Sequence, residues 1–393
     1  MLRLFGLNRS PTPRPEHEPG RASELAEAVR ARLPRLLANA AQHSGPPPGV
    51  QVAYAEHGRV LYAEAFGLSD AATGTPLTIH HAFTLASQSK PVAAVVAMRL
   101  AEAGLIDLDE PLLARVRHWR PSNEQLCGLN ADAATIRHAL SHTSGWDLRS
   151  LPMHPADHAA TAPRLEDLLS GIAGPQYTPR MRSAPDTSRL YSGAAYTMLQ
   201  LALEAATGEP YAALVDRLVA RPLGWSGTWA GWDPSRLGRL AGGHGPTPNP
   251  RPVERAFYPA LASSGLFGTA SDVASLWSAV AGIALGSTST PDLLSPVSAR
   301  GMLSPVPVPG DGIEFGLGFA LTPWADLTVF KHAGWCPGFW GTTEGLAELG
   351  VAASVQCNMS EPAGKFVAQR LCGFVLERAR ALHGVPAPPP AAR

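Results

Sequence analysis

The stretch FTLASQSKPVAAVVAMRLAEAG, residues 83–104, places a serine and a lysine at the start of a long apolar segment. The segment after Pro91 is apolar almost all round, which predicts a buried helix that ends at Gly104. Because proline is tolerated only near the start of a helix, this helix should begin close to Ser87. Residues i and i+3 are neighbours on a helix, so Lys90 should lie on the same face as Ser87.

The choice of lysine at position 90 is informative. The chain has 32 Lys+Arg, and only Lys90, Lys331 and Lys365 are lysines. An ionised lysine stabilises a serine alkoxide and a neutral lysine can take the serine proton, whereas arginine, with a pKa above about 12, can do only the first. The free N–H groups at the start of a helix also favour negative charge on Ser87. We therefore interpret the pair as a nucleophile and its partner, with a chance Ser-x-x-Lys spacing as the alternative.

Composition and charge restrict the class of protein. The 393 residues are 45% hydrophobic and 16% charged, which is typical of a globular enzyme with a sizeable core. The formal net charge of +0 provides no excess positive field for nucleic acid or for an anionic membrane, so neither is expected as a partner. No apolar run approaches the roughly 20 residues of a membrane span.

The cysteines and the N-terminus predict a cytoplasmic protein. The apolar residues near the N-terminus are too few for a secretory signal. The cysteines are scattered and form no CxxC motif, which is consistent with a reducing compartment. They are Cys127, Cys336, Cys357 and Cys372.

The pattern along the chain predicts an α/β (α+β) fold, namely an antiparallel β-sheet flanked by helices with a large, mainly helical insertion lobe. Strands are expected at both ends of the chain and helices between them, so the two ends should form one sheet. The expected elements are a helix over about 21–42 with a kink or break at Pro34, a hairpin of 50–55 and 60–66, strands over 327–331 and 350–357, and a helix over about 362–383.

These elements define the expected domain organisation. Residues 1–20 are rich in proline and are predicted to be a disordered leader, and residues 386–393 a disordered tail. Residues 21–385 are predicted to form a single domain. Within it, we expect an α/β lobe from about 45–115 and 300–383, and a helical lobe from about 116–300.

Several further segments resemble one known family. Ser87-Gln-Ser-Lys90 is similar to the S-x-x-K motif of serine β-lactamases and penicillin-binding proteins. The remaining segments are similar to the branch of class C β-lactamases, D-alanyl-D-alanine carboxypeptidases and family VIII esterases, in the family's order across about 48–360. They are Gly67-Leu-Ser-Asp70, Gly74-Thr-Pro76, Gly104-Leu-Ile-Asp-Leu-Asp-Glu-Pro111, Thr135-Ile-Arg-His-Ala-Leu-Ser-His-Thr-Ser-Gly145, Tyr191-Ser-Gly193, Arg221-Pro-Leu-Gly224, Ser264-Gly-Leu-Phe-Gly-Thr-Ala-Ser-Asp272, and His332-Ala-Gly334 followed by Pro337-Gly338.

The resemblance implies four catalytic side chains. Ser87 would attack the carbonyl and become acylated, and Lys90 would lower the cost of ionising it. Tyr191, held as a phenolate by Lys90, would take the serine proton and pass it to the leaving group. His332 would donate to the tyrosine oxygen or to a substrate carboxylate, and it should titrate near neutral pH. Lys331, one residue earlier on a strand, should point to the opposite face of the sheet.

The resemblance also implies an oxyanion hole and a substrate-binding strand. The hole would use the backbone N–H groups of Ser87 and Trp335. Gly334 would let the substrate lie close to the strand, and the substrate-binding positions would be Gly193, Gly334 and Trp335. Gly193 departs from the family pattern, which has asparagine there. This departure puts tight β-lactam or peptide recognition in doubt and should leave room for another acyl group or a water.

Rival sites are weaker. His138 and His142, like His154 and His158, have a spacing that can bind zinc, but neither pair has the glutamate of H-E-x-x-H, so packing and hydrogen bonding are favoured and no metal or cofactor is expected. Cys336 is a poor candidate for a thiol nucleophile. Of the tryptophans, Trp225, Trp229 and Trp232 should be packing residues, while Trp335 and Trp340 should border the cleft and favour an apolar or aromatic acyl group.

The sequence therefore predicts a cytoplasmic SxxK serine hydrolase that cleaves an ester or amide bond of a small molecule through an acyl-enzyme on Ser87. Two alternatives stay open. One is a transacylase or peptide cyclase in natural-product biosynthesis that uses the same acyl-enzyme. The other is a non-catalytic, β-lactam-binding-like sensor. The acyl group, the leaving group and the oligomeric state are not specified by the sequence.

Overall fold

The computed structural model describes residues 20–245, 251–287, 290, 292–308, 312 and 314–386. The predicted leader, apart from Gly20, and the predicted tail, apart from Pro386, lie outside the described residues. Within these ranges, no helix combines the length and the apolar character that crossing a bilayer would require.

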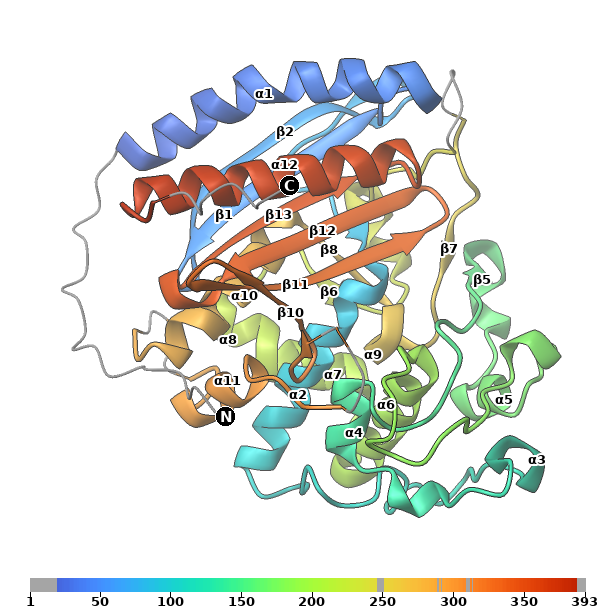
Figure 1. Cartoon of the computed structure of the whole chain (residues 1–393). Coiled ribbons are helices and arrows are strands. Elements are labelled where there is room, and N and C mark those ends of the chain that lie inside the picture. The colour runs from blue at the N-terminus through green and yellow to red at the C-terminus, as the bar shows by residue number, and fades with distance from the viewer. Residues whose placement is uncertain are drawn as a thin grey trace.

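Both ends of the chain contribute to one antiparallel sheet, which has eight strands in the described residues (Figure 1). Its order is β3-β2-β1-β13-β12-β11-β10-β9, and β1 and β13 pair in register from Val50 opposite Cys357 to Glu56 opposite Val351. The sheet of the predicted fold is thus confirmed. Its strands are β1 (Gly49–Glu56), β2 (Arg59–Asp70), β3 (Thr75–Pro76), β9 (Glu314–Phe315), β10 (Ala320–Trp324), β11 (Leu327–Cys336), β12 (Phe339–Leu346) and β13 (Val351–Cys357).

Helices cover both faces of this sheet. In Figure 1, α1 (Gly20–Ser44) and α12 (Ala363–Leu382) lie over one face and α10 (Ala270–Ala284) over the other. Side chains alternate along a strand, so Val52 of β1 joins the apolar cluster with α1 and α12, while Ala53 packs against α10. Burial on both faces explains why β1 has apolar residues at neighbouring positions, as in Val52-Ala53-Tyr54, and does not alternate between apolar and polar residues.

Helix α1 differs from its prediction at one residue. The sequence predicts a kink or a break at Pro34; the helix continues through Pro34, so a break is wrong and a kink stays a prediction. Pro34 is exposed, as is Arg30 four residues earlier. Water can therefore reach the backbone carbonyl that loses its helical partner at a proline.

The middle of the chain forms the helical lobe below the sheet in Figure 1. Its core contains α2 and α6, and α10, which the sequence places in this lobe, packs against the sheet as well. The remaining helices of the described residues are α2 (Ser89–Glu102), α3 (Asn123–Leu126), α4 (Ile136–Ser141), α5 (Leu165–Leu169), α6 (Gly193–Thr207), α7 (Tyr211–Val215), α8 (Arg221–Leu223), α9 (Leu261–Ser264) and α11 (Pro296–Met302). Short strands outside the main sheet are β4 (Phe83–Thr84), β5 (His154–Pro155), β6 (Trp229–Ala230), β7 (Ala256–Phe257) and β8 (Leu266–Gly268).

The segment that carries Ser87 lies between the sheet and the helical lobe. Strand β4 pairs with β8 and leads into a 3-10 turn, Ala86–Gln88, and then into α2. The sheet touches this turn at Gly334 of β11, where an added Cβ would lie 2.0 Å from the Leu85 carbonyl oxygen. Only glycine allows this approach, which fixes the strand against the turn.

Candidate active site

Ser87 and Lys90 are in direct contact. Lys90 Nζ donates a hydrogen bond to Ser87 Oγ over 3.1 Å. Ser87 lies in the 3-10 turn and Lys90 in the first turn of α2, slightly different from a single helix that starts at Ser87. The turn is held in place by Ser89, whose Oγ donates to the Ala86 carbonyl (2.7 Å) and accepts from the Leu266 N–H (3.1 Å). The predicted proximity of serine and lysine is confirmed.

The surroundings of Lys90 favour its neutral form. Its side chain is fully buried, and Nζ also donates to the Ser263 carbonyl over 2.9 Å. Among the described residues, no carboxylate lies within ion-pair distance of it. Burial without an acidic partner lowers the pKa of Lys90 from 10.5 to about 7. Near neutral pH a large fraction of Lys90 can therefore accept a proton.

Tyr191 lies beside the pair. The Lys90 ammonium nitrogen is 5.0 Å from the centre of the Tyr191 ring, and the phenol is hydrogen-bonded to Ser87. Burial raises the pKa of Tyr191, although the hydrogen bond with Ser87 and the nearby charge of Arg149 oppose this rise. The expectation that Lys90 holds Tyr191 as a phenolate is therefore wrong for the free protein, because the shift keeps the phenol protonated.

His332 lies near Tyr191, with 6.0 Å between the ring centres. Burial and the nearby charge of Lys90 lower the pKa of His332 to about 3, so the expectation that it titrates near neutral pH is wrong. Its Nδ1 donates to the Ala333 carbonyl over 2.9 Å, which leaves Nε2 as an acceptor. This Nε2 is buried and has no hydrogen-bond partner. His332 is thus placed to accept a hydrogen bond, not to donate one as expected.

His142 is a site residue whose role the sequence did not reveal. Its Nδ1 accepts the Ser192 N–H over 3.1 Å, and its ring centre is 4.3 Å from that of Tyr191. The Leu190 N–H donates to the His142 carbonyl over 2.9 Å. His142 therefore holds the chain on both sides of Tyr191. Only the folded structure shows this contact, because 49 positions separate His142 from Tyr191 in the sequence.

The expected oxyanion-hole positions come together at the end of β11. Gly334 lies against the turn with Ser87, which brings the Trp335 backbone to the same region. The Trp335 side chain is 52% exposed and, by register, shares a sheet face with Trp340. Trp340 is buried in the cluster with α1 and α12, and so does not border the site as expected. The N–H groups of Ser87 and Trp335 remain a prediction as oxyanion donors.

Gly193 does not leave the expected room. A Cβ added there would lie 2.3 Å from the Arg149 carbonyl oxygen and 2.8 Å from Ser263 Oγ. The position that carries asparagine in the family is thus closed by the backbone of Arg149, in the loop between α4 and β5. The expectation of space for an acyl group or a water at Gly193 is wrong, because this segment occupies it.

The histidine pairs and Cys336 serve other purposes. His138 accepts the Thr135 N–H and contacts Asp186, and His154 contacts the His158 carbonyl. No cluster of three or more potential metal-ligating side chains occurs within the described ranges. Burial raises the pKa of the Cys336 thiol, which disfavours a thiolate nucleophile.

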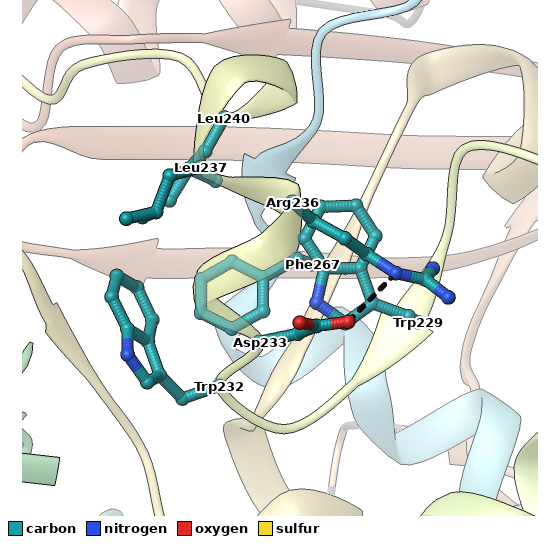
Figure 2. Close-up of a pocket in the computed structure, with 7 residues that line it drawn as sticks. All are labelled: Trp229, Trp232, Asp233, Arg236, Leu237, Leu240 and Phe267. Carbon is teal, nitrogen blue, oxygen red and sulfur yellow. Dashed lines mark ion pairs between the residues drawn. The ribbon is translucent and has the colours of Figure 1, made fainter.

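A small depression of about 150 Å³ lies elsewhere, beside β6 and β8 (Figure 2). Its lining includes Trp229, stacked on Phe267 at 5.5 Å between ring centres, and an ion pair between Arg236 and Asp233 at 3.0 Å. None of the predicted catalytic residues lines it. The tryptophans here are packing residues, as predicted.

Comparison with known proteins gives a consistent family. The family model described as Beta-lactamase matches residues 35–370. The chain is 33% identical to esterase EstB of Burkholderia gladioli over 206 residues, 51% of each protein, and 29% identical to penicillin-binding protein 4* of Bacillus subtilis (strain 168) over 182 residues, 44% of this chain and 36% of that protein. These alignments thus span about half or less of the relatives' length.

A solved structure supports the same fold. The structure titled "EstCE1, a hydrolase with promiscuous acyltransferase activity" superposes with a TM-score of 0.70 at 24% sequence identity. The match covers 90% of this chain and 99% of that one. At this identity the likeness shows the fold alone.

Proposed function

The chain belongs to the beta-lactamase family, and we propose that it is a serine hydrolase that cleaves an ester or amide bond of a small molecule through an acyl-enzyme on Ser87. The observation that carries the proposal is the buried Lys90 amine, 3.1 Å from Ser87 Oγ and without an acidic partner among the described residues. Such an amine is half neutral near pH 7 and can accept the serine proton.

The pKa directions support an order of proton transfers. Neutral Lys90 takes the proton of Ser87 as Oγ bonds to the substrate carbonyl carbon. The N–H groups of Ser87 and Trp335 hold the resulting oxyanion. When the bond to the leaving group breaks, the Tyr191 hydroxyl gives that group a proton, and the Lys90 ammonium restores the proton to Tyr191. The leaving group departs neutral and Ser87 is acylated.

Hydrolysis of the acyl-enzyme reverses these roles. Lys90 and Tyr191, now both in their starting states, remove a proton from a water that attacks the acyl carbon, and Ser87 recovers its proton as the acid leaves. His332 supports this stage, because its Nε2 has no hydrogen-bond partner and its ring centre is 6.0 Å from that of Tyr191, so it can accept a hydrogen bond from a donor near Tyr191.

The direct test is active-site labelling. A fluorophosphonate probe should label the wild-type protein, and Ser87→Ala should abolish both labelling and hydrolysis of aryl esters. Ser226→Ala, which removes an exposed serine hydroxyl, is the matched control and should label normally. Labelling that persists in Ser87→Ala would refute the assignment. Addition of an alcohol acceptor separates hydrolysis from acyl transfer, because transfer would give a new ester as the main product.

A further inference from the structure

The loop between α4 and β5 presents an arginine, Arg149, beside the catalytic groups. The N–H groups of Gly193 and Ala194 donate to the Leu148 carbonyl over 2.9 and 3.2 Å, and Ser192 Oγ donates to the Asp147 carbonyl over 3.1 Å. Leu148 has a φ of 77°, an unusual value for a residue other than glycine. The fold thus fixes the backbone immediately before Arg149, although Leu148 has an unfavourable conformation.

The Arg149 side chain is exposed and lies over Tyr191. Its guanidinium carbon is 5.9 Å from the centre of the Tyr191 ring. Its closest acidic neighbour in sequence, Asp147, is already paired with Arg182 over 2.6 Å and accepts the Arg180 N–H over 2.7 Å. Among the described residues, no carboxylate forms an ion pair with Arg149.

Arg149 also carries a permanent positive charge beside Tyr191. Burial lowers the pKa of Lys90 to about 7 and that of His332 to about 3, so both lose charge near neutral pH. A guanidinium keeps its charge at every pH that the protein meets. The exposed Arg149 therefore places a positive charge, without an acidic partner among the described residues, next to Tyr191, which would protonate the leaving group.

The depression of Figure 2 offers a contrast. Arg236 lies over the ring of Trp229 at 5.1 Å, as Arg149 lies over Tyr191, but Arg236 is paired with Asp233. Its charge is thus compensated inside the protein. Arg149 has the same type of aromatic contact and lacks the acidic partner, which leaves its five N–H donors free for a ligand.

We propose that Arg149 binds a carboxylate of the substrate, so that the preferred substrates are anionic esters or amides. The inference rests on the proposed hydrolase function and specifies its substrate class. Arg149 takes over the place of the asparagine of the family motif in two ways: its backbone fills the space at Gly193, and its side chain supplies a charged recognition group. The carboxylate can belong to the acyl part or to the leaving group.

The test compares matched substrates. One pair of aryl esters has an acyl chain that ends in a carboxylate or in a carboxamide, and a second pair has the carboxylate or the carboxamide on the leaving phenol. In one of the two pairs, Arg149→Gln should lower the ratio of kcat/KM for the carboxylate to that for the carboxamide by about tenfold. Arg149→Lys should retain part of the preference, and Arg236→Gln should leave the ratio as in the wild type.

The ratio separates recognition of the carboxylate from a general effect of Arg149 on Tyr191, because a general effect would lower kcat/KM equally for both esters of a pair. An unchanged ratio in both pairs would overturn the inference. Binding to Ser87→Ala, measured by calorimetry with the same four esters, does not depend on turnover. If the wild-type protein hydrolyses none of them, the proposed function fails. The inference about Arg149 is then tested by binding alone: Arg149→Gln in the Ser87→Ala background should weaken binding of a carboxylate ester and not of the matching carboxamide, and equal binding would overturn it.

Discussion

Two buried polar groups meet at the turn that carries Ser87, and they differ in how fully their hydrogen bonds are satisfied. In the first, Lys90 and His332 lack charged partners, and His332 Nε2 has no partner at all. In the second, the Gln88 amide exchanges hydrogen bonds with Gln356 over 3.1 and 3.2 Å and accepts from Thr343 over 2.6 Å.

The second group is completed by Ser354, whose hydroxyl is hydrogen-bonded to that of Thr343 over 2.9 Å and accepts from the Gln356 amide over 3.0 Å. It joins the turn to β12 and β13, so a network in which each buried polar side-chain atom has a partner holds the turn that carries Ser87. Two neighbouring residues thus have different roles: Gln88 holds the turn in place, and Ser87 is the predicted nucleophile. Gln88 uses its hydrogen-bonding capacity within the protein, whereas the groups around Ser87 keep theirs for a substrate.

Replacement of Lys90 should have the largest effect. Lys90→Arg keeps a positive charge but cannot become neutral, so the acylation rate should fall by about 10³-fold. Stopped-flow measurement of the acylation burst with an aryl ester gives this rate. Lys365→Arg makes the same chemical change at an exposed lysine and should have normal activity. Near-normal acylation in Lys90→Arg would contradict the role of a neutral amine.

Removal of the Tyr191 hydroxyl should have the next largest effect. Tyr191→Phe loses the proton donor to the leaving group, and kcat/KM for an ester with a poor leaving group should fall by about 10²-fold. Esters with good leaving groups, such as nitrophenols, should be affected less because they need no proton. Tyr62→Phe, on the side of the sheet near α1, is the control. Equal losses for both kinds of ester would count against this role.

The pH dependence follows from the pKa of Lys90. Because the reactive form is neutral and the pKa is about 7, kcat/KM should fall about tenfold for each pH unit below 7 and level off above it. His332, with a pKa of about 3, should add no step near neutral pH. The measurement is a pH–rate profile from pH 5 to 9 with a neutral ester. A flat profile would mean that the reactive form of Lys90 is not the neutral amine.

The smallest effect on activity is expected from a change in the hydrogen-bond network around Gln88. Gln88→Met removes the hydrogen bonds that Gln88 makes with Gln356 and Thr343, which then keep only those with Ser354, and this should lower the free energy of unfolding by about 1–3 kcal/mol. Activity should fall only a few-fold at a temperature where the variant is folded, because no reacting group is lost. Denaturant titration and esterase assays measure the two effects. Loss of activity as large as in Lys90→Arg, with unchanged stability, would place Gln88 in the chemistry instead.

The sequence predicted those parts of the site that depend on local spacing. The three-residue separation of Ser87 and Lys90 led to their contact, whereas Tyr191 and His332 were implied by the family resemblance. The sequence also predicted that the two ends of the chain share a sheet, because strand patterns occur there and helical patterns between them.

The parts that were missed depend on contacts between distant segments. The Ser263 carbonyl that binds Lys90 comes from the short helix α9, and the Arg149 backbone that closes Gly193 comes from a loop; both are distant in sequence from the residues they contact. Protonation states were missed for the same reason, since the pKa values of Lys90 and His332 depend on burial by the whole fold. Residue types can show which groups react, but not what surrounds them.

Intact-mass spectrometry of the protein after reaction with a panel of aryl esters, D-amino acid amides and β-lactams tests the central claim most directly. We predict a mass increase equal to one acyl group, located by peptide mapping at Ser87 and absent in Ser87→Ala. An acyl group on another residue, or turnover by Ser87→Ala at the wild-type rate, would contradict the account.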